Sequence, residues 1–486
     1  MRDAGIAVRS NLRIRADATR VITRLFIPGK ELVGGSLSRT SETIARVLDL
    51  EESEVDEALS DLVARFSKRH ENLAADFEQN ADRVEDYLRA PISANRRQLL
   101  GAAFTHEYSL EGASVCNPSL VAHPNQIGVR DGGLRVLMSY RSIGEGHRSC
   151  ICFRTGVIDA NGALRFDDPL PFPVAGLTAQ GPLLREVFRA KLRDLHLDDE
   201  AAALILMTLP ESFSIKELDA ALARMARHND TRQNVAESAN VLRSLSECFY
   251  VATFPEDVEL SRRVLWPSTP CESSGVEDAR FVKIPEDGAP RYVATYTAFD
   301  GRNVAQQLLE TDDFVTFTSS PLAGRGAENK GLAIFPRRIG DRFVGLSRYD
   351  RESNAIAFSS DLHYWDQVSN LQIPSESWEM LQLGNCGSPI ELPEGWLMIT
   401  HGVGPMRTYS IGALLLDLDD PTKVLARLSK PLLIPDADEQ DGYVPNVVYS
   451  CGSLVHAGTL YLPYGIADQS LSYCTVSVKD LLAVMH

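Results

Sequence analysis

The feature that most constrains the fold of this chain is a series of short apolar runs separated by turn residues, extending from about residue 104 to the end. Runs such as LRVLMSYRS, PRYVATYTAFDG, RFVGLSRYD and GWLMITHGV are rich in Val, Ile, Tyr, Phe and Thr. These residue types are enriched in strands, and the regular turns between the runs are typical of antiparallel sheets. The pattern therefore predicts a mainly β domain.

The same region carries a weak repeat, in which a strand leads to a turn with Asp and then to Leu or an aromatic residue. It occurs as ETDDFVTF, SSDLHYW, LLDLDDP and SVKDLLAV, which begin at residues 310, 359, 415 and 477. The spacing of about 50 to 60 residues is near the period at which four-stranded propeller blades recur. We therefore predict a five-bladed β-propeller; a β-sandwich is the competing architecture, and the repeat favours the propeller.

Two segments have the pattern of helices instead. Between residues 41 and 100, apolar residues recur at intervals of three and four, which predicts two or three amphipathic helices. A second helical segment, 183–248, interrupts the strands. We expect an N-terminal strand plus helical region over 1–103 and a β-propeller over 104–486 that contains the insertion. Because amphipathic helices must bury their apolar faces, we expect the N-terminal helices to support a homo-oligomer.

The charge balance argues against nucleic-acid binding. Lys and Arg number 49 against 66 Asp and Glu, a net charge of −17, whereas nucleic-acid binding usually needs a basic face. No run of about 18 apolar residues occurs and the N-terminus lacks the apolar core of a signal peptide, so we expect no membrane partner. The eight cysteines form no C-x-x-C pair, which predicts buried free thiols in a reducing cytoplasm.

Polar and charged residues at the ends of the apolar runs form the candidate site. In a propeller such ends converge on the central channel, where ligands bind. Taken singly, each residue also fits a structural role: adjacent acids such as Glu277 and Asp278 usually form a solvated turn. The candidates combine a few carboxylates with several cations; they are Asn117, Arg141, Glu277, Asp278, Arg280, Tyr296, Asp300, Lys330, Arg348, His401, Arg407, Asn446 and Asp468.

Missing motifs disfavour several enzyme classes. The sequence contains no G-x-S-x-G elbow, no P-loop, no G-x-G-x-x-G and no H-E-x-x-H. A serine hydrolase, an NTPase, a dinucleotide-binding enzyme and a zinc protease are therefore not expected. The Asp and Glu residues also lack the spacing of a metal site, so we predict neither a metal nor another cofactor.

Read together, the motifs resemble a single family. In chain order, GVEDAR, YTAFDG, KGLAIFP, GNCGSPIELPEGWLMITHGVG, YSIGALLLDLDDPTKVL, GYVPNVVYSCG and YGIAD resemble glycoside hydrolase family 130, the β-mannoside phosphorylases and β-1,2-mannosidases. The resemblance covers about 114–486 without the insertion, and LLDLDDPTKV with VPNVV-x-x-CG is a specific pair. It implies a five-bladed propeller and an enzyme of carbohydrate metabolism. The implied reaction is inverting phosphorolysis of β-mannosides, with β-1,2-linked manno-oligosaccharides as substrates and α-mannose 1-phosphate as product.

The resemblance also implies residue roles. The family's catalytic acid is the Asp of its G-V-E-D-P-R motif, which matches Asp278; it is thought to act through the substrate's 3-hydroxyl while phosphate attacks the anomeric carbon from the opposite face. Such an acid must be protonated, so we expect burial or Glu277 to hold its pKa up. Phosphate binding falls to the basic residues Lys330, Arg348, His401 and Arg407. Sugar binding falls to Asn117, Arg141, Glu277, Tyr296, Asp300, Asn446 and Asp468.

Departures from the family pattern leave alternatives open. Ala279 replaces the family's Pro, the strand after YTAFD offers no cation beyond Arg302, and GNCGSP stands where the family has a run of prolines. Without a phosphate site the protein would be an inverting β-mannosidase, in which a carboxylate such as Glu379 or Asp441 activates water. A non-catalytic glycan-binding propeller is the remaining alternative.

Overall fold

The computed structural model describes residues 3–27, 32–33, 37–88, 90–198, 200–228, 235–285 and 291–486. The chain forms two compact units. The larger comprises Met1–Ala16, Ala113–Pro169 and Ala175–His486, and the smaller comprises Asp17–Gly112 with Leu170–Val174. The main breaks thus fall at residues 16/17 and 112/113, whereas the sequence predicted one boundary at 103/104.

The smaller unit is mainly helical. Its helices are α1 (Arg39–Asp49), α2 (Glu52–Phe66), α3 (Leu73–Asp82) and α4 (Ala94–Ala103), and its paired strands are β3 (Val21–Leu25) with β6 (Thr105–Ser109) and β4 (Leu32–Val33) with β5 (Leu37–Ser38). Val55, Leu100 and Phe104 belong to its apolar core. The buried guanidinium of Arg96 donates to the carbonyls of Val47 and Leu50, which the helix ends leave free.

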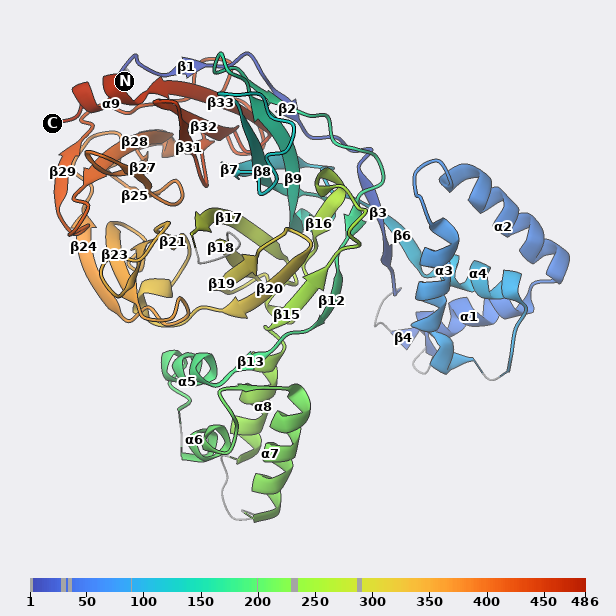
Figure 1. The fold of residues 1–486 in the computed structure, drawn as a ribbon. Helices are drawn as coiled ribbons and strands as arrows, with labels where there is room; N and C mark the ends of the chain where they lie inside the picture. Colours follow the sequence, from blue (N-terminus) through green and yellow to red (C-terminus); the bar gives the residue numbers. More distant parts are fainter. Residues whose placement is uncertain are drawn as a thin grey trace. The chain divides into compact units, whose positions relative to one another are not determined.

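The larger unit is mainly β and contains consecutive antiparallel meanders (Figure 1). The first consists of β7 (Ser114–Ala122), β8 (Leu134–Ile143), β9 (Ser149–Ile158) and β10 (Leu164–Phe166), and the second of β17 (Gly275–Ile284), β18 (Arg291–Phe299), β19 (Val304–Thr311) and β20 (Thr316–Pro321). One parallel pairing, between Ser149 and Gly275, joins them into a twelve-stranded sheet. Its short strands are β11 (Val174–Ala175), β12 (Leu177–Gln180), β15 (Tyr250–Thr253) and β16 (Arg263–Leu265).

Three further sheets follow along the chain. The third meander is β21 (Ala333–Ile334), β22 (Phe343–Ser347), β23 (Asn354–Ser359) and β24 (Gln367–Gln372), and the fourth is β25 (Gln382–Asn385), β26 (Ile390–Leu392), β27 (Gly395–Val403), β28 (Tyr409–Leu416) and β29 (Val424–Arg427). The fifth is β30 (Val448–Tyr449), β31 (Leu454–His456), β32 (Thr459–Ile466) and β33 (Ser470–Ser477), followed by α9 (Val478–Ala483). The N-terminal strands β1 (Val8–Arg9) and β2 (Ile14–Arg15) both pair with β33.

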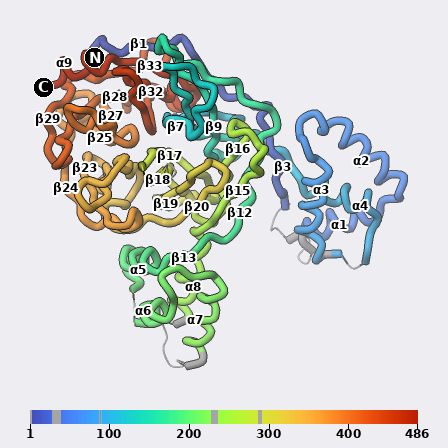
Figure 2. Tube along the Cα trace, viewed as in Figure 1, coloured from blue at the N-terminus to red at the C-terminus, as the bar shows by residue number. Residues whose placement is uncertain are grey.

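Apolar cores lie between successive meanders because neighbouring residues of a strand face opposite sides of its sheet. Phe281 and Val282 of β17 enter two different cores, as do Met398 and Ile399 of β27. The meanders follow one another around a common centre (Figure 2). The last returns to the first, since the backbone N–H of Cys451 donates to the carbonyl of Pro118 at 2.8 Å.

The predicted insertion is a helical subdomain between β12 and β15. It contains β13 (Leu183–Leu184), α5 (Arg185–Asp194), α6 (Glu200–Met207), β14 (Ser212–Phe213), α7 (Ile215–His228) and α8 (Val235–Ser246), and it has its own apolar core. Lys191 of α5 donates to the carbonyl of Leu322, and the carboxylate of Asp194 accepts from the N–H of Gly324. These bonds attach the insertion to the segment that follows β20.

A buried carboxylate ties the N-terminal strands to the fifth meander. The side chain of Glu439 is fully buried and lies 3.5 Å from Nε of Arg9 and 3.1 Å from a terminal nitrogen of Arg13. The hydroxyl of Tyr464 on β32 donates to the same carboxylate at 2.8 Å. One buried carboxylate therefore joins the N-terminal strands to the last meander of the larger unit.

We expect Glu439→Gln to lower the free energy of unfolding by about 2–4 kcal/mol, because it removes the buried charge that two arginines face. Urea denaturation measures this loss. Asp438→Asn is the matched control: its side chain is 77% exposed although it also lies 3.4 Å from Arg13, so the expected loss is under about 0.5 kcal/mol. Equal losses in the two variants would contradict the assignment.

Candidate active site

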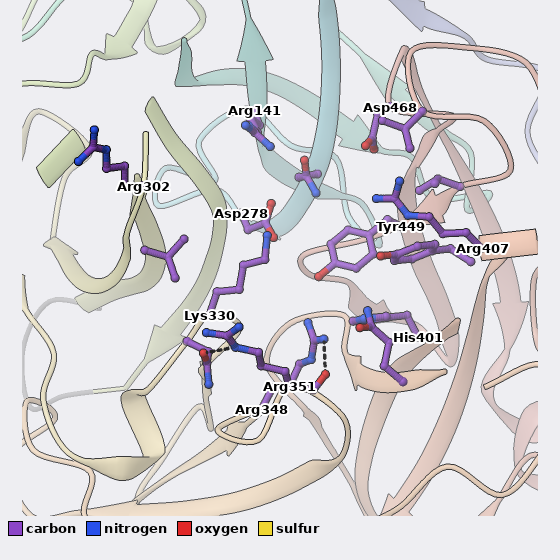
Figure 3. Close-up of a pocket in the computed structure, with 17 residues that line it drawn as sticks. Arg141, Asp278, Arg302, Lys330, Arg348, Arg351, His401, Arg407, Tyr449 and Asp468 are labelled. Atoms are coloured by element: carbon purple, nitrogen blue, oxygen red, sulfur yellow. Dashed lines mark hydrogen bonds between the residues drawn. The ribbon is translucent and has the colours of Figure 1, made fainter. Parts of the chain in front are cut away.

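A cavity of about 530 Å³ is lined by residues from all five meanders of the larger unit (Figure 3). It contains most of the residues that the sequence proposed for a site. Those that line it are Asn117, Arg141, Asp278, Lys330, Arg348, His401, Arg407 and Asp468. Residues from distant parts of the chain are thus brought together around one space large enough for a small ligand.

Strained backbone aims several of these side chains into the cavity. Asn117 and Asp278 have φ values of 51° and 55°, and each stands at a break in strand register, in β7 and β17 respectively. Arg407 and Asp468 also have positive φ, at 54° and 47°. This backbone conformation costs free energy for a residue other than glycine, and residues strained in this way cluster at functional sites. The bulges re-aim the side chains at the inner ends of the strands.

A fully buried arginine anchors Asp278. The guanidinium of Arg280 lies 3.7 Å from the carboxylate of Asp278 and donates to the backbone carbonyl of the same residue at 2.7 Å. It also donates to the hydroxyl of Tyr449 at 2.7 Å and to Oδ1 of Asn385 at 3.2 Å. Arg280 therefore acts from behind the cavity, which its side chain does not line.

Glu277 holds two cations at the edge of the cavity rather than lining it. Its carboxylate accepts from Arg141 at 2.7 Å and lies 3.5 Å from Nζ of Lys330. Figure 3 shows the side chains of Lys330 and Asp278 pointing toward each other. The adjacent acids Glu277 and Asp278 therefore have different roles: the first pairs with Arg141 and Lys330, and the second faces the cavity.

The pKa of Asp278 lies below its ordinary value, which contradicts the expectation that its surroundings hold it up. Burial raises the pKa, but the positive charges of Lys330, Arg280, Arg141 and Arg348 together outweigh burial. In the unliganded protein Asp278 is therefore a carboxylate. Donation of a proton by Asp278 requires a partner that offsets these cations.

His401 is neutral, contrary to its prediction as a cationic ligand. Burial, followed by the charges of Arg348, Arg280 and Lys330, lowers its pKa well below the usual range. Its Nδ1 lies 3.1 Å from the carbonyl oxygen of Asn385; since a carbonyl only accepts, Nδ1 carries the proton. The ring stacks on that of Tyr409, with centroids 5.9 Å apart. His401 therefore adds a hydrogen-bonding group to the cavity and no charge.

Asp468 is the second carboxyl group of the cavity. Burial raises its pKa to about 6, helped by the charge of Asp278 and opposed by those of Arg141 and Arg407. Its backbone carbonyl accepts from the hydroxyl of Ser114 on β7. The pKa values of Asp278 and Asp468 are thus shifted in opposite directions from the ordinary value of an Asp side chain.

Besides Arg280, four of the candidate residues lie outside the cavity lining. The hydroxyl of Tyr296 is buried and donates to Glu272, and Asp300 accepts from the backbone N–H groups of Arg302 and Asn303 in a turn. Asn446 lies outside the lining, where its carbonyl accepts from the N–H of Tyr409 at 2.9 Å. The fourth is Glu277.

Sequence reasoning also missed residues that line the cavity. Arg351 follows Arg348 by three residues in one turn, where Arg348 donates to its carbonyl and Arg351 itself donates to Asn329 (Figure 3). For most of the other missed residues, the sequence offered one signal, which was their nearness along the chain to a proposed residue. They are Arg302, Val304, Asn329, Gln382, Tyr409, Val444, Val447 and Tyr449.

Neither carboxylate considered for a hydrolase lines the cavity. Glu379 is buried and accepts from the backbone N–H groups of Ser375 and Glu376, and Asp441 is exposed. Within the described ranges, no three His, Cys, Asp or Glu side chains are placed to hold a metal ion. No helix in that part of the chain is long and apolar enough to cross a membrane. The eight cysteines all lie within the described ranges, and none of them forms a disulfide.

Several known proteins are similar to this chain in sequence. A family model described as β-1,4-mannooligosaccharide phosphorylase, of glycoside hydrolase family 130, matches residues 253–486. A 1,2-β-oligomannan phosphorylase of Thermoanaerobacter sp. strain X514 is 35% identical over 235 residues, which are 46% of this chain and 75% of the relative. A β-1,2-mannobiose phosphorylase of Listeria innocua is 34% identical over 227 residues, 45% of this chain and 62% of the relative.

Solved structures give a broader but weaker likeness. The β-1,2-mannobiose phosphorylase of Listeria innocua in complex with β-1,2-mannobiose aligns with 76% of this chain and 92% of its own, at 23% identity and a TM-score of 0.43. The sequence likeness carries the assignment, because it spans three quarters of the Thermoanaerobacter enzyme. The chain belongs to glycoside hydrolase family 130.

Proposed function

We propose that this protein cleaves β-mannosides by inverting phosphorolysis, releasing α-mannose 1-phosphate, with β-1,2-linked manno-oligosaccharides as the preferred substrates. One observation carries the proposal: a buried carboxylate, Asp278, faces a cavity whose other charged groups are mostly cations. A phosphate nucleophile needs such cations, since burying a dianion without partners is costly. Relatives that are named β-1,2-mannobiose and 1,2-β-oligomannan phosphorylases support the substrate class.

The proposed roles follow from position and charge. Phosphate binds against Lys330 and Arg348, where its negative charge offsets the cations that lower the pKa of Asp278. Asp278 then takes up a proton and passes it, through the 3-hydroxyl of the sugar, to the oxygen of the departing group. An oxygen of phosphate forms the new bond to the anomeric carbon from the opposite face, so that the mannosyl group is transferred with inversion.

The sugar of the cleaved bond would be held on the other side of Asp278. Arg141 and Asp468 lie across Asp278 from Lys330 and Arg348 (Figure 3), and Asn117 also lines the cavity. The hydrolytic alternative has less support, because Glu379 and Asp441 lie outside the cavity lining. We propose no cofactor beyond phosphate as co-substrate.

We also propose that the five meanders are the blades of a five-bladed β-propeller. The cores between successive meanders support this arrangement, as does the contact of the fifth with the first through Cys451 and Pro118. The pairing of β1 and β2 with β33 would close the ring with strands from both chain ends.

Two properties of the whole protein remain proposals. A reducing cytoplasm as its location is supported by eight cysteines in the described ranges that form no disulfide. A homo-oligomer formed by the N-terminal helices is supported by Leu48 of α1 and Val63 of α2, which are each 39% exposed.

The decisive test is product analysis with β-1,2-mannobiose and with β-1,4-mannosyl-glucose, each with and without inorganic phosphate. Mannose 1-phosphate that appears only with phosphate is the expected result, and free mannose formed at a phosphate-independent rate would contradict it. Asp278→Asn should abolish turnover, whereas Asp441→Asn should leave it unchanged. A glycan-binding protein would instead keep its ligand affinity in the Asp278 variant and show no turnover in the wild type.

Arg348→Ala should raise the phosphate concentration needed for half-maximal rate by about 30- to 150-fold, with a much smaller effect on that for the mannoside. The physical reason is the loss of one charge-assisted contact to phosphate, worth about 2–3 kcal/mol. Steady-state kinetics in both substrates measures the two effects. Arg342→Ala, an exposed arginine of the same meander, should change neither. Equal changes for phosphate and mannoside in the Arg348 variant would remove its assigned role.

Asp468→Asn should stabilise the protein at high pH and hardly at all near pH 4. The wild-type pKa is raised to about 6 from an ordinary 3.8, so native stability is lost as pH rises from the lower value through the higher. The variant should therefore gain up to about 3 kcal/mol at pH 8 and under about 1 kcal/mol at pH 4. Asn also tolerates the positive φ of this position. Urea titrations at both pH values test this, and a gain independent of pH would contradict it.

A further inference from the structure

One ring nitrogen of His401 has no hydrogen-bond partner in the cavity. The side chain is fully buried, and its Nδ1–H is committed to the carbonyl of Asn385. The other ring nitrogen, Nε2, is buried and has no hydrogen-bond partner. In this tautomer Nε2 bears a lone pair, so it can only accept a hydrogen bond.

The groups around His401 keep the ring neutral. Tyr409 of β28 stacks on one face, and Tyr449 of β30 meets the ring edge-to-face with centroids 4.8 Å apart. The charged groups whose fields lower its pKa are Arg348, Arg280 and Lys330, so protonating the ring would add a fourth positive charge. The hydrogen bond to the carbonyl of Asn385 favours the charged form of the imidazole, but burial and these cations outweigh it.

The ring of His401 lies beside Arg348, one of the proposed anion ligands, and both side chains line the cavity. A methyl group built on Gly384 would come within 2.2 Å of Cε1 of His401 and 2.7 Å of Nε of Arg348, so both side chains pack on that glycine. Nε of Arg348 is also buried without a partner. An anion in the cavity would face donors from Arg348 and Lys330, and the unpartnered nitrogen of His401 belongs to the same lining.

We propose that His401 selects the nucleophile, because Nε2 accepts a hydrogen bond from the hydroxyl of hydrogen phosphate and repels an oxyanion without a proton. The inference deepens the proposed function, on which it rests, by naming the form of anion that the cavity accepts. Hydrogen phosphate offers one O–H donor besides its acceptor oxygens, whereas sulfate at neutral pH offers acceptors alone. Sulfate would therefore place an anionic oxygen against a buried lone pair, and cations alone would not distinguish the two anions.

Binding of four tetrahedral oxyanions to the wild-type protein tests the proposal by calorimetry at about pH 8, without sugar. Phosphate and arsenate carry a proton under these conditions, and sulfate and selenate do not. We expect the first two to bind at least about 30-fold more tightly than the last two, the difference that one unpaired buried group can cause. Sulfate affinity within about threefold of phosphate affinity would overturn the proposal and leave His401 as a structural support for Arg348.

A variant supplies the second measurement. The amide of His401→Gln can donate as well as accept, so sulfate should gain at least about tenfold in affinity relative to phosphate. His363→Gln, outside the cavity lining, is the matched control and should leave the ratio unchanged. An unchanged ratio in the folded His401 variant would overturn the proposal, and the wild-type series decides alone if that variant does not fold.

These binding experiments separate the inference from the proposed function. Selective phosphate binding by a protein that releases no mannose 1-phosphate would support the anion selectivity and contradict phosphorolysis. A working phosphorylase that binds sulfate as tightly as phosphate would keep the reaction and contradict the role of His401.

Discussion

The buried guanidinium of Arg280 is the interaction on which the rest of the site depends. From β17 it donates to Tyr449 on β30, to Asn385 on β25 and to the backbone of Asp278, so one charged group joins three meanders at their inner ends. A buried cation is tolerated only when its donors find acceptors, which fixes each of these partners in place. Asn385 extends the network, because its carbonyl accepts from His401 and its amide donates to Gly331.

The electrostatics of the cavity follow from this arrangement. Asp278 stands among four cations and its pKa falls, whereas Asp468 faces fewer cations and the negative charge of Asp278, and its pKa is raised. His401 sits close to the same cations and becomes neutral. A single electropositive cavity therefore shifts the pKa values of three groups differently, and its positive charge favours an anion while it disfavours protonation of Asp278.

The sequence was a good guide to the fold and a partial guide to the site. The apolar runs between turn residues predicted a mainly β unit, and the structure contains one. Tyr296 is a candidate because it lies at the end of an apolar run, and the family resemblance implies sugar binding, yet its hydroxyl donates to the buried Glu272. Side-chain direction in that strand decided the outcome, and residue type alone does not encode the side of the sheet on which a site lies.

By itself, the sequence determined a mainly β unit with an N-terminal helical region and a helical insertion, and its resemblance to glycoside hydrolase family 130 implied Asp278 as the candidate acid. These conclusions depend on local periodicity and on contiguous motifs, which neighbouring residues along the chain carry. Only the tertiary structure decided the charge states of Asp278, Asp468 and His401, and which cations face them. Those properties arise from bulges that turn side chains inward and from burial among groups on other meanders, and both depend on contacts between residues far apart in the chain.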